Sequence, residues 1–141
     1  VLDQDPASIN ERDVAGQTAL HWAARMGNID AVRKLLCYEA DASARELLGW
    51  TPLHFAAQNY NGSIMVLLIF EALVEEGAEV NRRDNYGNTP LAYAIHHNNV
   101  PVFRALRRLG VELDFETSAG QTVLHVAAWW AKSQILRDLI D

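Results

Sequence analysis

The sequence predicts an all-α solenoid of stacked helix–turn–helix units, because one short phrase and the helices that follow it recur along the chain. The phrase Gly-x-Thr-x-Leu begins at residues 16, 49, 87 and 120. Its glycines are 33 (16 to 49), 38 (49 to 87) and 33 (87 to 120) residues apart. Self-similarity at a period of this length is typical of supersecondary units that bury their apolar faces against one another.

The residues after each phrase have the pattern of two helices. A pair of small or apolar residues follows directly, as at Ala23 and Ala24 in the first unit. A glycine or small-residue turn, such as residues 77–81, closes the unit. Between them, a second stretch places apolar residues at helical spacing on one face, as at Ile29, Val32, Leu35 and Leu36.

The longer pattern D-x-x-G-x-T-P-L-H-x-A-A is met nearly in full at residues 13–24 and 84–95, and clearly at 46–57 and 117–128. On these residues the chain resembles the ankyrin-repeat family, from about residue 2 to residue 141. The resemblance implies an ankyrin-repeat solenoid, in which each unit has a short helix, a longer helix and a β-turn or hairpin finger. It also implies a concave surface lined by the fingers and the ends of the first helices.

The resemblance implies that residues 1–141 form a single repeat domain. Residues 1–12 match the tail of a preceding repeat or an N-terminal cap, and residues 13–45, 46–83 and 84–116 form three repeats. Residues 117–141 form a fourth, truncated repeat. Because the chain lacks an initial methionine and stops before a closing turn, we expect it to be part of a longer scaffold or regulatory protein.

Threonine begins the first helix of each unit. Thr51 and Thr89 are followed by proline, which suits the first helical position because its missing N–H has no partner to lose there. The histidines His21, His54 and His125 share one position, and the resemblance implies that they join neighbouring loops by hydrogen bonds. The equivalent residues Trp22, Phe55, Tyr93 and Val126 are expected to pack half-buried between helices.

The second unit is five residues longer than its neighbours (38 − 33 = 5). The extra residues lie around residues 59–63, and Ser63 is a candidate helix cap. We therefore predict a longer loop and a second helix that ends near Glu75 and is roughly one turn longer. Burial against adjacent helices is favoured over an exposed patch for its apolar residues Ile64, Met65, Leu67, Leu68 and Ile69.

Composition and charge limit the classes of partner. The net charge of −6 argues against a nucleic-acid or anionic-membrane binder, which needs a basic face. Cys37 is the one cysteine, so no disulfide forms within the chain. The longest apolar run, residues 64–70, is far shorter than the ~20 residues of a membrane span. We expect an intracellular setting, in the cytoplasm or nucleus, or in a host cell if the source is bacterial.

Catalytic and metal-binding patterns are missing from the sequence. The glycines follow the repeat period rather than a phosphate-binding loop, and no serine has a G-x-S-x-G context. His96 and His97 are neighbours, so they point in different directions on a helix, unlike a metal-binding pair four residues apart. We expect no enzyme, no cofactor and no metal site.

The resemblance leaves certain finger and inner-helix positions free for a partner. Trp, Tyr, Met and Arg, which are enriched in interface cores, are frequent there. The candidate partner-binding residues are Arg12, Met26, Arg45, Leu47, Leu48, Trp50, Gln58, Asn59, Arg83, Asn85, Tyr86, Asn88, His96, His97, Trp129 and Trp130. The other free positions are Val14, Ala15, Gln17, Arg25, Glu116, Ser118, Ala119 and Gln121.

Arginines repeat at one finger position and cluster beside the third unit. Arg12, Arg45 and Arg83 could form a ladder facing carboxylates, which would guide association more than it adds affinity. Arg107 stands where the family usually has leucine. We favour its pairing with an acidic residue on the preceding longer helix, at Glu71, Glu75 or Glu76. The alternative is that the arginines of the third unit form a cationic patch for an acidic peptide.

These observations predict a protein–protein interaction module, with Trp50 and Tyr86 as favoured contacts and a monomeric state unless array ends stack. Two alternatives stay open. One is a methyl-lysine peptide reader, with rings from Trp50, Tyr86, Trp129 or Trp130. The other is a structural spacer in a longer array.

The residues around Asn81 resemble a hydroxylation pattern found in ankyrin repeats. Leu73 precedes Val80 and Asn81 at the spacing of that pattern. Asn81 is therefore a candidate hydroxylation site. The alternative is a turn residue, because an asparagine side chain bonds nearby backbone groups.

Overall fold

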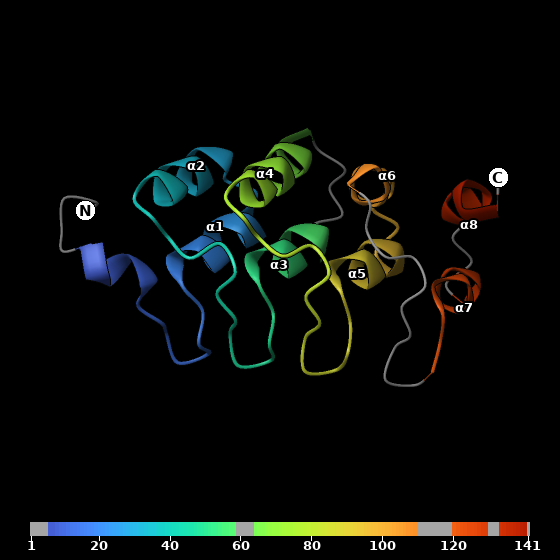
Figure 1. Ribbon diagram of the computed structural model, residues 1–141, viewed down its shortest axis with the longest axis horizontal. Helices are drawn as coiled ribbons and strands as arrows, with labels where there is room; N and C mark the ends of the chain where they lie inside the picture. Colours follow the sequence, from blue (N-terminus) through green and yellow to red (C-terminus); the bar gives the residue numbers. More distant parts are fainter. Residues whose placement is uncertain (1–5, 59–63, 110–119, 130–132, 141) are drawn as a thin grey trace.

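The computed structural model describes residues 6–58, 64–109, 120–129 and 133–140. After the 3-10 helix η1 (Pro6–Asn10), the described chain forms helix pairs separated by loops (Figure 1). The pairs are α1 (Ala19–Met26) with α2 (Ile29–Cys37), α3 (Pro52–Gln58) with α4 (Ile64–Glu75), α5 (Pro90–His96) with α6 (Val100–Arg108), and α7 (Val123–Trp129) with α8 (Ser133–Ile140). No strand occurs in these ranges, which confirms the all-α prediction.

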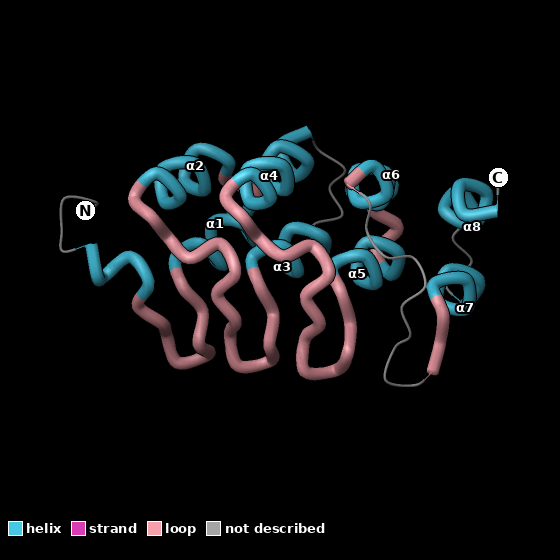
Figure 2. The backbone as a smooth tube through the Cα atoms, in the orientation of Figure 1, coloured by secondary structure: helices cyan, strands magenta, loops and turns pink. Residues whose placement is uncertain are grey.

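The helices form two rows. The short helices α1, α3, α5 and α7 pack in sequence order in one row, and the longer α2, α4, α6 and α8 pack above them (Figure 1). Loops before α1, α3 and α5 extend from the row of short helices as fingers (Figure 2). The predicted solenoid of stacked units with fingers is therefore confirmed.

Side-chain caps begin the helices in both rows. Thr18 and Thr89 cap α1 and α5 by accepting from a backbone N–H three residues later, as the sequence predicts. Asn28 and Asn99 cap α2 and α6 in the same way. These side chains satisfy N–H groups that a helix start otherwise leaves without a partner.

The core runs through the stack between the two rows. The repeated leucines of the first three units, Leu20, Leu53 and Leu91, are each 0% exposed. Their equivalent Leu124 is 48% exposed, because within the described chain no further pair packs on α7 and α8. Burial of this position therefore depends on a neighbouring unit.

Helix α4 confirms the prediction of a longer helix in the second unit. It has 12 residues, compared with 9 in α2 and in α6, and it ends at Glu75. Ile69 is fully buried and Leu67 and Leu68 are partly buried, whereas Met65 is exposed. The predicted burial of its extra apolar residues is thus correct for one face. The inserted loop, the Ser63 cap and the Ile64 side chain lie outside the described residues.

Candidate functional site: a groove between the first two fingers

Histidines join the first finger to the second and the second finger to the third. Nε2 of His21 donates to the carbonyl oxygen of Trp50 at 2.9 Å, and Nε2 of His54 donates to that of Asn88 at 3.0 Å. Nδ1 of each ring accepts from the N–H of its own cap threonine at 3.0 Å, so each ring is neutral. Burial, which disfavours the charged ring, lowers the pKa of His21 and lowers that of His54 to about 4. The predicted role as a tie between loops is confirmed for His21 and His54, whereas the hydrogen bonds of His125 to described residues are to Thr122 of its own unit.

A carboxylate shapes each described finger. The acidic residue that opens the finger accepts from the backbone N–H groups two and four residues later, at 2.6–3.0 Å. These residues are Asp13, Glu46 and Asp84. Gly49 closes the second turn at φ +80°, and a Cβ there would lie 2.9 Å from the backbone nitrogen of Asn85. The fingers are therefore fixed by their own backbones before any partner binds.

Trp50 is held inside the array more firmly than the sequence indicates. Its indole N–H donates to Asp84 at 2.7 Å, and its ring packs edge-on against Phe55 and Tyr93, at centroid distances of 5.3 and 5.6 Å. Tyr93 donates its hydroxyl to the same carboxylate. Burial, together with this hydrogen bond, raises the pKa of Tyr93 to about 12. Trp50 is half-buried and links the second unit to the third.

The first two arginines of the proposed ladder bind neighbouring fingers. Arg12 donates to the carbonyl oxygens of Gly16, at 3.0 Å, and of Arg45. Arg45 donates to the side-chain oxygen of Asn85 at 3.3 Å, and Asn85 in turn donates to the Leu47 carbonyl at 2.9 Å. Arg12 and Arg45 therefore link neighbouring fingers, and the ladder of arginines facing carboxylates stays a prediction.

Arg107 binds the following unit rather than the preceding one. Its guanidinium donates to the carbonyl oxygen of Asp138 at 2.5 Å, while Arg104 forms an ion pair with the Asp138 carboxylate at 2.8 Å. The hydrogen bond from Arg104 lowers the pKa of Asp138. The predicted pairing of Arg107 with α4 is therefore wrong, because α8 offers a nearer acceptor.

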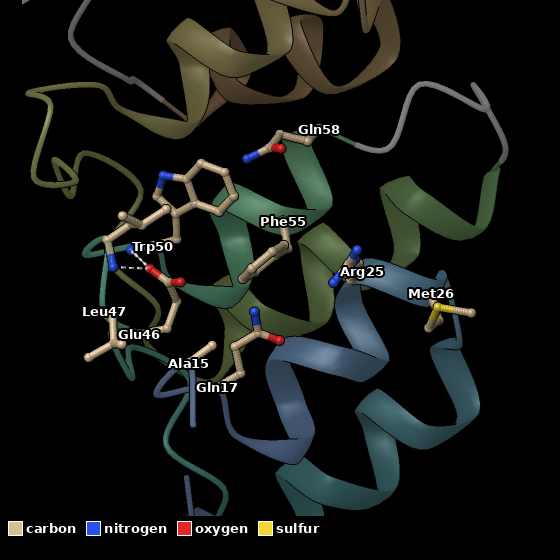
Figure 3. A pocket seen from close by; sticks show the side chains of 10 residues that line it. Ala15, Gln17, Arg25, Met26, Glu46, Leu47, Trp50, Phe55 and Gln58 are labelled. Atoms are coloured by element: carbon tan, nitrogen blue, oxygen red, sulfur yellow. Dashed lines mark hydrogen bonds between the residues drawn. The ribbon is translucent and has the colours of Figure 1, made fainter. Parts of the chain in front are cut away.

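One groove collects several free positions. It has a volume of about 720 Å³ and lies between the first two fingers and the ends of α1 and α3 (Figure 3). Met26, Leu47 and Leu48 line it and are 71%, 68% and 38% exposed. The remaining lining residues are Ala15, Gln17, Arg25, Glu46, Trp50, Phe55 and Gln58. The groove thus combines exposed apolar side chains with a few polar groups, as binding sites do.

The other sequence-predicted residues lie elsewhere. Tyr86 is exposed at the third finger, with Arg83 and Asn88, and His96 and His97 end α5. Trp129 is exposed at the end of α7, in the fourth unit. Asn81 is exposed in the turn after α4. Asn59 and Trp130 lie outside the described residues.

The described residues contain neither a metal-binding cluster nor a membrane-spanning helix. Across the described ranges, no group of three or more His, Cys, Asp or Glu side chains could hold a metal ion. In that same part of the chain, no helix has the length and apolar character needed to cross a bilayer.

A stack of helix pairs with turn-fixed fingers and histidine ties defines the ankyrin-repeat class of protein. The family model for ankyrin repeats matches residues 2–84, 44–116 and 67–141. The chain therefore belongs to the ankyrin-repeat family. Ankyrin repeats are generally protein–protein interaction modules and are typically not catalytic.

The chain is similar to parts of larger ankyrin-repeat proteins. It is 35% identical to Rabankyrin-5 of Mus musculus, over 79% of this chain and 9% of that protein. It is 32% identical to a homolog of the transient receptor potential cation channel subfamily A member 1 from Caenorhabditis elegans, over 99% of this chain and 11% of that protein. It is 30% identical to Neurogenic locus notch homolog protein 1 of Homo sapiens, over 84% of this chain and 6% of that protein. The chain thus spans about a tenth or less of these relatives.

Proposed function

We propose that this domain recognises a partner protein through the groove between its first two fingers. The observation that carries the proposal is that Met26, Leu47 and Leu48 line one groove and stay exposed while neighbouring framework groups bond one another. Burying such a side chain contributes about 1.5–3 kcal/mol. The fingers are already ordered, so binding loses little conformational entropy at these residues.

A matched pair of variants tests this proposal. Leu47→Glu/Leu48→Glu places charge in the groove, whereas Val14→Glu places charge on a first-finger residue that is 100% exposed and does not line the groove. Each protein is used to capture partners from a lysate of the source organism, and bound proteins are identified by mass spectrometry. We expect a partner that binds the parent and Val14→Glu but not the groove variant. Equal capture by all three proteins refutes the groove.

A structural spacer is the second candidate function, and specific observations favour it. Trp50, Arg12 and Arg45, all predicted as partner contacts, use polar groups to join units of the array. A spacer requires these hydrogen bonds between units but does not require a binding groove. It predicts that the groove variant keeps every interaction of the longer protein, whereas loss of the ties lowers stability.

The methyl-lysine alternative has less support. A cage needs several rings within about 6 Å of one cation. Trp50 instead packs against Phe55 and Tyr93, and Tyr86 lies at the third finger while Trp129 lies on α7. Equal binding of methylated and unmethylated peptides would remove this alternative.

Asn81 remains a proposed hydroxylation site, because it is exposed in its turn and accessible to an enzyme. Mass spectrometry of the protein from its native cells would show one added oxygen on the Asn81 peptide. An unmodified peptide at full coverage contradicts the proposal.

A further inference from the structure

Two glutamine side chains in the groove contain polar atoms without a hydrogen-bond partner. Oε1 of Gln17 and Nε2 of Gln58 are both shielded from solvent, yet neither has a partner in the described structure. Figure 3 shows these side chains on either side of Phe55, one from the first finger and one from the end of α3. Buried polar atoms of this kind are uncommon in folded proteins and call for an explanation.

The chemistry of the two amides matches a peptide main chain. A primary amide offers an acceptor oxygen and N–H donors on one plane, and a main chain offers the complementary N–H and C=O groups. The last torsion of a glutamine side chain is broad, so both amides can turn toward a ligand at low cost. This match holds whichever end of each amide is oxygen.

Apolar and charged groups surround the amides. Met26, Leu47 and Leu48 provide exposed apolar surface around the groove. Arg25 also lines the groove, and its guanidinium carbon lies over the Trp22 ring, 5.3 Å from the ring centre. A guanidinium group offers N–H donors that match a carboxylate. The one lining carboxylate, Glu46, already accepts from Leu48 and Trp50. The charge at the groove therefore favours an acidic group over a basic one.

We propose that the groove binds an extended segment of the partner protein that combines acidic and apolar residues. Gln17 and Gln58 hydrogen-bond its main chain, Arg25 binds a carboxylate, and apolar side chains pack on Met26 on one side of Phe55 and on Leu47 and Leu48 on the other (Figure 3). This inference rests on the proposed function, since it names the partner chemistry for the same groove. Because both atoms are shielded from solvent in the unbound array, this pairing requires the two amides to turn into the groove.

Selection from a random linear peptide library tests the inference. The library is displayed on phage, selected on the whole chain and counter-selected on Leu47→Glu/Leu48→Glu. We expect an enriched pattern with acidic and apolar residues. Gln17→Met/Gln58→Met keeps side-chain size and removes the amides, so we expect the selected peptide to bind roughly tenfold more weakly. Val14→Glu, outside the groove, should bind it as the parent does.

N-methylation of the selected peptide provides a readout that needs no protein variant. Methylating the one or two peptide nitrogens that donate to the amides should weaken binding about tenfold or more, while methylation elsewhere has little effect. Arg25→Glu should lose the acidic peptide and gain binding when the peptide's acidic residue is changed to lysine.

The outcomes separate the two proposals. Peptides that require Leu47 and Leu48 but tolerate both the glutamine variant and N-methylation overturn main-chain recognition and leave the groove intact. A basic consensus overturns the charge assignment. Failure to enrich any peptide overturns the linear-segment inference, while a folded partner that still distinguishes the groove variant supports the proposed function. Peptides that bind all variants equally contradict both.

Discussion

Replacing Trp50 with phenylalanine isolates the hydrogen bond that joins the second and third units. Trp50→Phe keeps an aromatic ring against Phe55 and Tyr93 but removes the N–H that donates to Asp84 at 2.7 Å. A hydrogen bond to a charged group contributes about 1.5–3 kcal/mol. Asp84 keeps donors from Tyr93 and two backbone N–H groups, so no oxygen is stranded. We therefore expect a loss near the lower limit, about 1.5 kcal/mol.

Urea unfolding followed by circular dichroism measures this loss, and Trp22→Phe is the matched control. Trp22 donates its indole N–H to Asp13 at 3.1 Å, but both side chains are exposed. Exposed substitutions usually change stability by less than ~0.5 kcal/mol. A shifted midpoint at constant denaturant slope is expected for Trp50→Phe. If Trp50→Phe costs no more than Trp22→Phe, the internal role assigned to Trp50 is refuted.

Three further predictions concern stability. Because folding lowers the pKa of His54 from 6.5 to about 4, His54 stabilises the fold fully above pH 6.5, and about 3 kcal/mol of this stability is lost as the pH falls through 4. Chemical unfolding across this pH range should show the loss. A His54→Gln variant whose unfolding free energy falls with pH as steeply as that of the parent contradicts this prediction. Leu91→Ala should cost about 2–5 kcal/mol, and Leu124→Ala clearly less, because only Leu91 is fully buried; equal melting shifts would refute this. Leu47→Glu/Leu48→Glu should melt within a few degrees of the parent, since both leucines are exposed; a large drop would show that they support the fold.

The repeated phrase was sufficient to predict the helix pairs and the histidine ties. Where a unit is followed by another described unit, each phrase residue meets equivalent neighbours, so its role follows from its position in the repeat. The longer α4 follows in the same way, because five added residues must lengthen a loop or a helix. Leu124 shows the limit of this reasoning, since its burial depends on a neighbouring unit rather than on its own repeat.

Long polar side chains could not be placed from the sequence. The repeat gives the position of Arg45, Trp50 or Arg107 in its unit but not the atom that its side chain reaches. Trp50 lies at a free finger position, yet the next finger brings the Asp84 carboxylate within 2.7 Å. Arg107 had acceptors available on both neighbouring units, and it binds α8.

The groove was predicted in its parts but not as one site. Met26, Leu47, Leu48 and Gln58 were all identified as free positions. Their gathering around Phe55, and the unpartnered amide atoms of Gln17 and Gln58, depend on how the first two units stack. No sequence pattern reports a missing hydrogen bond.

Site-specific photo-crosslinking tests the central claim, recognition of a partner at the groove, most directly. A photoreactive phenylalanine analogue is placed at Leu48 in the groove and, in a separate protein, at Met65, which is exposed on α4 in the row of longer helices. Both proteins are irradiated with the captured partner. We predict a covalent adduct from position 48 and none from position 65. An adduct from position 65 alone would contradict the account.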